Sequence, residues 1–147
     1  MSFPILSAYT TQAMIGKQYC ELHIDALDGS WPQLGFSSSE TGLNYSVSSA
    51  GFWTPSGPDN LTINVGDIIM LASDGEGNCW FGQNGAWIGG GDPVTGANPT
   101  YTGLGANPYP SVSISEAVGA AGQATGRFQD SAFTYAVPAG FTSIQGD

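Results

Sequence analysis

Few residues of this chain combine the types and spacing that chemistry requires. The one histidine, His23, has acidic neighbours along an alternating segment, which favours a solvated surface side chain over a general base. Asp74, Glu76 and Asn78 alternate along a turn and offer oxygen ligands, as a calcium loop does, but the bidentate glutamate that closes such a loop is missing. We interpret this segment as a polar hairpin turn, and whether it binds a cation stays open.

The motifs of nucleophilic and phosphate chemistry are also missing from the sequence. It contains no Gly-x-Ser-x-Gly elbow and no Gly-x-Gly-x-x-Gly fingerprint, and Lys17 follows no glycine loop of the Walker type. A pair of carboxylates can hydrolyse glycosides, but the twelve acidic residues are scattered over turns and select no pair. We therefore expect no enzymatic activity, no catalytic residue and no cofactor.

The charge of the chain restricts its partners. Lys17 and Arg127 are the only basic residues beside twelve acidic ones, which gives a formal net charge of -10 and a pI of about 4.1. Nucleic acids and anionic membrane surfaces are bound by clusters of Lys and Arg, which this chain cannot form. No apolar run approaches the ~18 residues of a membrane span. The remaining partners are a protein, a glycan, a cation or further copies of the chain.

The two cysteines and the N-terminal residues bear on the compartment. Cys20 and Cys79 each lie in an apolar, strand-like segment, so we interpret them as free thiols of the core, with a disulfide between them as the alternative. Residues 1–13 have no basic region followed by an apolar stretch, so we expect no secretion signal and a cytoplasmic location by default.

The glycine and proline pattern predicts an all-β protein. With 22 Gly and 9 Pro, turn signals recur every eight to twelve positions, as in two-sheet antiparallel sandwiches, and we expect one domain over residues 1–147. Residues 16–26 alternate and predict a strand with one buried face. Its expected core side is Cys20, Leu22 and Ile24, and its expected solvent side is Tyr19, Glu21 and His23.

Further strands follow from apolar runs bounded by turns. Residues 68–73 are apolar on both faces and predict a strand that is covered on two sides. Asn84-Gly85 predicts a tight type I′ hairpin turn after the next strand. The other expected strands are residues 33–37, 61–65, 79–82, 112–115 and 123–128, the last two joined by a turn at residues 117–122.

Aromatic residues in turn-rich segments are the candidate contacts with a partner. We expect loops at residues 27–32, 51–60 and 89–110, and aromatic side chains on loops are typical of protein hot spots and sugar-binding sites. The candidates are Trp31, Trp53, Tyr101 and Tyr109. The alternative for each ring is that it points inward and anchors its loop. Trp80 and Trp87, which flank the predicted hairpin, are expected to pack in the core.

Several of these segments together resemble the SPRY family. Residues 66–69 and 79–87, which read GDII and CWFGQNGAW, resemble its central hairpin, and Gly16-Lys17-x-Tyr19-x-Glu21 resembles its early strand. Leu34-Gly35-Phe36 and the motifs YPSVS, FTY and PAGF between residues 109 and 141 extend the resemblance over residues 16–141. The resemblance implies a concanavalin-like jelly roll of two sheets that binds proteins through its loops, without catalysis.

A narrower resemblance concerns the glycine-rich loop. Residues 89–93 and 96–99 resemble the SPRY modules of bacterial and bacteriophage virion proteins. This implies a virion structural protein, as a capsid decoration or a tail or fibre component, with many copies in one particle. The alternative function is a lectin-like module that binds glycans of a host receptor, suggested by loop aromatics with Asp, Asn and Gly nearby.

Overall fold

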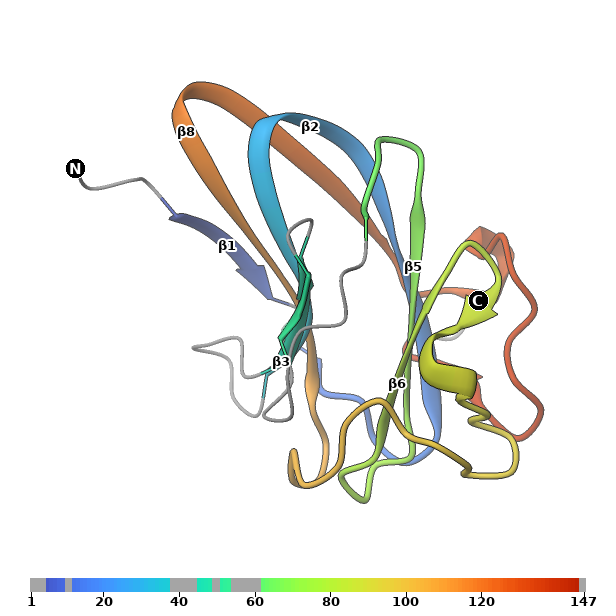
Figure 1. The fold of residues 1–147 in the computed structure, drawn as a ribbon. Coiled ribbons are helices and arrows are strands. Elements are labelled where there is room, and N and C mark those ends of the chain that lie inside the picture. Colours follow the sequence, from blue (N-terminus) through green and yellow to red (C-terminus); the bar gives the residue numbers. More distant parts are fainter. Residues whose placement is uncertain (1–4, 10–11, 38–44, 49–50, 54–61, 146–147) are drawn as a thin grey trace.

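The computed structural model describes residues 5–9, 12–37, 45–48, 51–53 and 62–145. Nine strands and two short 3-10 helices lie in these residues (Figure 1). They are β1 (Ile5–Tyr9), β2 (Gln18–Ser37), β3 (Tyr45–Ser48), β4 (Gly51–Trp53), β5 (Ile68–Ser73), β6 (Cys79–Gln83), β7 (Ala86–Trp87), η1 (Ile88–Gly90), β8 (Tyr109–Arg127), η2 (Asp130–Ala132) and β9 (Thr142–Ser143). Among the described residues, no helix has the length and hydropathy of a membrane span.

Two long strands build both layers of the fold. β2 and β8 pair antiparallel from Glu21 opposite Arg127 to Ser37 opposite Tyr109, and the pairing shifts between Ile24 and Ala26 and again between Asp28 and Ser30. Such irregularities bend strands, and both strands arch over at this point (Figure 1). The predicted two-sheet antiparallel sandwich is confirmed.

The arch divides the strands into two layers, which we name after one strand of each. The β5 layer contains β5, β6 and β7 with residues 18–24 of β2 and 122–127 of β8. The β3 layer contains β1, β3 and β4 with residues 30–37 of β2 and 109–116 of β8. Because both layers share β2 and β8, hydrogen bonds continue from one layer to the other without a break in the chain of paired strands.

Two predictions of chain breaks were wrong for the same reason. Residues 27–32, expected to be a loop, lie inside β2, and Gly29 stands at the irregularity between Asp28 and Ser30. Residues 117–122, expected to be a turn, lie inside β8, opposite the same irregularity. Glycine and small residues indicate bulges as well as turns, so the sequence signal for a bend was correct and its interpretation as a loop was not.

The strand predicted at residues 61–65 is also wrong for residues 62–65, which form no strand. The amide of Gly66 donates to the carbonyl oxygen of Ile24 at 2.8 Å, and the amide of Ile24 donates to that of Asp67 at 2.9 Å. The turn therefore attaches to β2 at its first irregularity. Residue 61 lies outside the described residues.

The predicted hairpin is confirmed, and a carboxylate fixes it. Asn84 and Gly85 have φ angles of 50° and 89°, as a type I′ turn requires. Asp67 accepts hydrogen bonds of 2.7 Å from the side chains of Gln83 and Asn84 and from the amide of Asn64. Burial raises the pKa of Asp67, but these hydrogen bonds outweigh burial and hold the pKa below its usual value.

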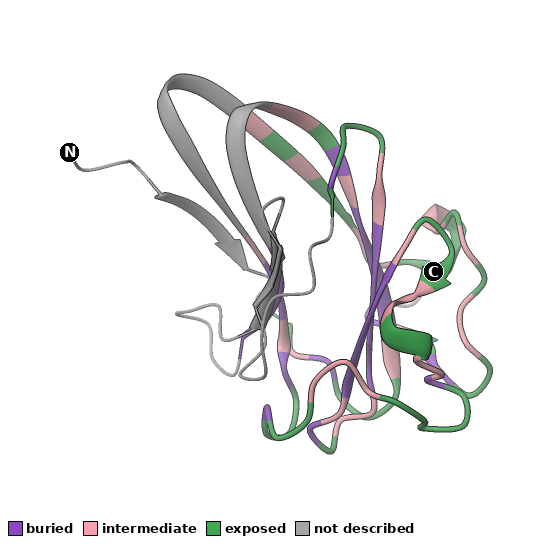
Figure 2. Ribbon diagram, in the orientation of Figure 1, coloured by how far each residue is buried: buried purple, intermediate pink, exposed green. Residues whose placement is uncertain are grey.

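The main core lies between the two layers (Figure 2). Phe36 from the β3 layer and Phe81 from the β5 layer meet with ring centroids 5.3 Å apart. Cys20 and Cys79 are buried in this core and are not bonded to each other, so the prediction of free thiols is confirmed. Burial raises the pKa of both thiols, that of Cys79 to about 12. Neither sulfur is therefore a nucleophile at neutral pH.

A second core lies on the outer side of the β5 layer. The side chains of Tyr19, Met70 and Trp80 are buried there beneath residues 128–141, which run back across the sheet after β8. The ring of Phe133 lies 5.0 Å from that of Tyr19, edge to face, and the ring of Phe141 lies 6.5 Å from that of Trp80. The prediction that Trp80 is a core residue is confirmed, and Trp87 packs partly buried against the same cluster.

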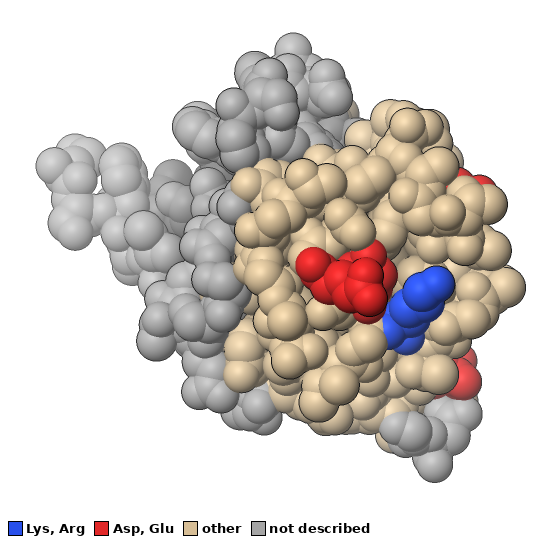
Figure 3. All heavy atoms as spheres, turned by 90° about the horizontal axis from the view of Figure 1, so that it is seen from below, with Lys and Arg blue, Asp and Glu red and all other residues tan. Residues whose placement is uncertain are grey.

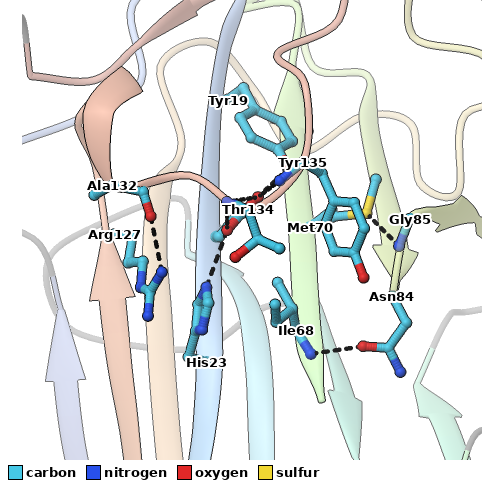
Figure 4. A network of polar contacts seen from close by, with 11 residues as sticks. Tyr19, His23, Ile68, Met70, Asn84, Gly85, Arg127, Ala132, Thr134 and Tyr135 are labelled. Atoms are coloured by element: carbon cyan, nitrogen blue, oxygen red, sulfur yellow. Dashed lines mark hydrogen bonds and ion pairs between the residues drawn. The ribbon is translucent and has the colours of Figure 1, made fainter. Parts of the chain in front are cut away.

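Glu21, predicted on a solvent face, is fully buried under this C-terminal segment, as is Tyr19. The carboxylate accepts hydrogen bonds from the Tyr19 hydroxyl at 2.9 Å and the Tyr135 amide at 2.8 Å, and from the Thr134 amide at 2.9 and 3.1 Å (Figure 4). His23 Nε2 lies 3.0 Å away. The alternation of residues 16–26 was read correctly, but the sequence did not indicate that a distant segment covers the second face.

Candidate interaction surface

Four segments meet at the end of the sandwich where β5 turns into β6, and we call this surface the loop end. It consists of residues 12–17, 74–78, 102–107 and 139–142. The amide of Met14 donates to the carbonyl oxygen of Pro108 at 2.7 Å, the amide of Leu104 to that of Gly77 at 3.4 Å, and the amide of Thr142 to that of Lys17 at 3.1 Å. These backbone contacts hold the four segments together.

Two glycines make the closest approach within the loop end. A Cβ atom on Gly75 would lie 2.6 Å from both the Cα and the nitrogen of Gly16, and Gly75 has a φ of +76°. Any side chain at position 75 would therefore both clash with backbone and strain its own conformation. The requirement for glycine at position 75 fixes the turn against the segment that leads into β2.

The turn at residues 74–78 is closed by its own carboxylate. Asp74 Oδ1 accepts the amides of Glu76 at 2.8 Å and Asn78 at 3.1 Å, and Oδ2 accepts the Asn78 side-chain amide at 2.6 Å. This geometry is that of the polar hairpin turn predicted from the sequence. Within the described ranges, no group of three or more His, Cys, Asp and Glu side chains is arranged to hold a metal ion.

The loop end presents an apolar side chain among polar and glycine residues. Ile15 is 69% exposed, more than the other large apolar side chains reported as exposed in the described residues. Lys17 is exposed, with Nζ 5.7 Å from the centroid of the Phe141 ring, and Glu76 is exposed in the adjacent turn. Figure 3 looks at this end from below and shows one basic side chain beside acidic ones, surrounded by uncharged atoms.

The long segment between β7 and β8, predicted as a surface loop, is attached to β6. The indole nitrogen of Trp80 donates to the carbonyl oxygen of Ala97 at 3.0 Å, and the amide of Phe81 donates to Thr100 Oγ1 at 3.0 Å. Asp92 closes a turn by accepting the Val94 amide at 2.9 Å and the Thr95 hydroxyl at 2.8 Å. The hydrogen bond from Thr95 is the main cause that lowers the pKa of Asp92.

Two of the four predicted contact residues have described side chains. Tyr101 exchanges backbone hydrogen bonds of 2.9 and 3.0 Å with Cys79, and its ring packs partly buried against the main core. This is the inward-pointing alternative, in which the ring anchors its loop. Tyr109 is the first residue of β8, opposite Ser37, and is partly buried.

The other two predicted contact residues lie in strands of the β3 layer. Trp31 is in β2, opposite Ser115, and Trp53 is in β4, opposite Ser46. Their side chains lie outside the described part of the chain, as do residues 54–60 of the predicted loop at 51–60. The four aromatic residues therefore do not share one loop surface, and a role in partner binding stays a prediction for each.

The sequence analysis did not select Ile15. The residue stands between Met14, which is fully buried, and Gly16, which has a φ of 70°. An apolar residue directly before a glycine with a left-handed conformation is a signal for exposure, but that conformation is visible only in the structure.

A comparison with solved structures identifies the architecture. The crystal structure of the SPRY domain of human HERC1 superimposes with a TM-score of 0.52 at 13% sequence identity, over 82% of this chain and 81% of that one. The fold is SPRY-like. No family model and no curated protein matches the sequence. The SPRY-like hairpin motifs at residues 66–69 and 79–87 correspond to the β5–β6–β7 meander, and the expected concanavalin-like sandwich is confirmed.

Proposed function

We propose that this chain is a non-enzymatic recognition module that binds another protein through its loop end. The observation that carries the proposal is the exposure of Ile15 on a surface whose backbone is fixed by hydrogen bonds and by the contact between Gly75 and Gly16. A surface that is already ordered loses little entropy on binding, and an exposed apolar side chain beside polar groups is a typical anchor. The SPRY-like fold supports the proposal because the SPRY resemblance implies protein binding.

The groups that could act in catalysis are already engaged elsewhere. Cys20 and Cys79 are buried, with raised thiol pKa values. His23 Nε2 lies 3.0 Å from the buried carboxylate of Glu21 and belongs to the network under the C-terminal segment. A general base must reach its substrate, and a buried thiol needs deprotonation to attack. These arrangements favour binding over chemistry.

Substitution at position 15 tests the proposal. We expect Ile15→Glu to weaken binding of a partner captured from the source of the protein by at least about tenfold, because burial of an isoleucine side chain is worth about 1.5–3 kcal/mol and the new carboxylate would enter the contact. Val65→Glu is the matched control, since Val65 is 59% exposed in the turn before β5, at the opposite end of the sandwich. Titration of each purified variant with the captured partner gives the affinities. Equal loss for both variants, or none for Ile15→Glu, would contradict the proposal.

We also propose that the module is a component of a bacteriophage virion, either a capsid decoration or part of a tail or fibre. The resemblance of residues 89–93 and 96–99 to virion SPRY modules supports this, and the net charge of -10 suits an outer surface away from packaged DNA. We expect mass spectrometry of purified particles to detect the chain in many copies, and cryo-electron microscopy to show its density outside the capsid or on the tail. Particles without the chain would refute the virion assignment and leave the recognition proposal intact.

The lectin-like alternative is not proposed. It depended on aromatic side chains on loops, but Tyr101 packs against the main core, and Trp31 and Trp53 belong to strands.

A further inference from the structure

The charges of the protein are distributed unevenly between the two layers. The sequence has 14 charged residues, yet the strand segments of the β3 layer contain one, Glu116, which pairs with Ser30 where β2 and β8 bend. The other segments of this layer, residues 5–9, 31–37, 45–48, 51–53 and 109–115, have no Asp, Glu, Lys, Arg or His. The β5 layer and its turns carry Glu21, His23 and Arg127 together with Asp67, Asp74 and Glu76.

The β3 layer also ends in an edge strand without the usual protection. β1 is the last strand on its side of the sheet order, and among the described strands it pairs with β8 alone, in one register from Ile5 opposite Ser115 to Tyr9 opposite Ser111. Proteins prevent edge-to-edge pairing with charged residues, prolines, bulges or very short edge strands. The sequence of β1, ILSAY, has neither charge nor proline, and its pairing shows no bulge. β7, at the other end of the order, has two residues and turns into η1.

We propose that β1 pairs antiparallel with β1 of a second copy of this chain, about a two-fold axis, so that two β3 layers form one continuous sheet. Two-fold symmetry requires that a strand paired with its own copy runs antiparallel to it. With residues 5 and 9 opposite each other, Ser7 faces Ser7 of the second copy.

The charge distribution favours a second copy over another partner. Two chains of net charge -10 repel each other, and their contact costs least where neither presents carboxylates. A basic partner would gain no electrostatic attraction from the β3 layer, since it offers that partner almost no carboxylate. This proposal is independent of protein binding at the loop end.

Sedimentation analysis of the purified chain from micromolar to several hundred micromolar concentration tests the proposal. Five paired residues make a small interface, so we expect a reversible dimer at the weak, micromolar end of the affinity range. Ser7→Asp places two carboxylates opposite each other at the axis, and we expect it to weaken dimerisation by at least about tenfold. A wild-type chain that stays monomeric over the whole range would overturn the proposal.

Two control variants separate charge at the edge from other effects. Ser7→Asn has nearly the shape of the aspartate without its charge and should dimerise within about threefold of the wild type. Thr102→Asp adds the same charge at an exposed position of the loop end and should leave the dimer unchanged. Dimerisation of Ser7→Asp with wild-type affinity would refute β1 pairing. If Ser7→Asp fails to fold, hydrogen exchange of the wild type decides: the β1 amides must become more protected as concentration rises, and constant protection refutes the proposal.

Discussion

Replacement of Glu21 by alanine is expected to lower the free energy of unfolding by about 3–5 kcal/mol. The carboxylate is fully buried, and it accepts hydrogen bonds from the Tyr19 hydroxyl and from the amides of Thr134 and Tyr135. Alanine would leave these donors buried without an acceptor and would open a cavity beneath the C-terminal segment. Chemical denaturation at pH 7 measures the loss, and hydrogen exchange should show that residues 133–137 lose protection first.

Glu21→Gln is the matched control because it keeps the shape of the side chain and one acceptor oxygen. We expect it to cost less, about 1–2 kcal/mol, since Oε1 accepts the Tyr19 and Tyr135 donors and Oε2 faces His23. An alanine variant as stable as the wild type would show that the hydrogen bonds to Glu21 do not hold the segment.

The same carboxylate makes stability depend on pH. Burial raises the pKa of Glu21, but hydrogen bonds from Thr134, His23, Tyr135 and Tyr19 outweigh it, so the pKa in the folded protein lies below its usual value. A group with a lowered folded pKa contributes its full stabilisation above its unfolded pKa, about 4.3, and loses it as the pH falls through the folded value. The stability difference between wild type and Glu21→Gln should therefore be largest near neutral pH and shrink below about pH 4. A difference that stays constant from pH 7 to pH 3 would contradict this linkage.

Replacement of Phe36 by alanine is expected to destabilise the protein by about 3–5 kcal/mol. Phe36 is fully buried in the β3 layer and its ring meets that of Phe81 from the β5 layer, so the substitution removes packing that joins the two layers. Phe36→Leu, which keeps most of the volume, should cost about 1–2 kcal/mol. Thermal and chemical denaturation give both values.

A double-mutant cycle isolates the contact between the two layers. Phe36→Leu and Phe81→Leu should couple by about 0.5–1.5 kcal/mol, because each removes the same ring pair. Additive effects of the two substitutions would mean that the two rings do not stabilise each other, and would argue against this packing of the sandwich.

Local patterns predicted the elements whose cause is local. The alternation of Cys20, Leu22 and Ile24 identified the inward face of β2, and Asn84-Gly85 identified the turn after β6, because side-chain period and positive φ are properties of a few adjacent residues. The free thiols and the buried Trp80 followed from apolar surroundings in the same way.

Features that depend on distant residues escaped the sequence. Tyr19 and Glu21 looked exposed because nothing near them indicates that residues 128–141 return to cover them. Gly29 looked like a loop residue because a glycine at a bulge and one at a turn give the same signal. Among the candidate contacts, Tyr101 was placed in the correct segment, but its inward position depends on its pairing with Cys79 in β6.

The sharing of β2 and β8 between both layers affects how the protein is made. Strand partners in these two elements lie as far apart in sequence as Glu21 and Arg127, so most pairs of the sheet are non-local and folding should be slow. On the ribosome, β2 emerges early and has no β8 to pair with until residue 127 has left the exit tunnel. Until then its apolar face is exposed, and nascent chains in crowded expression should be prone to aggregate or to need chaperones.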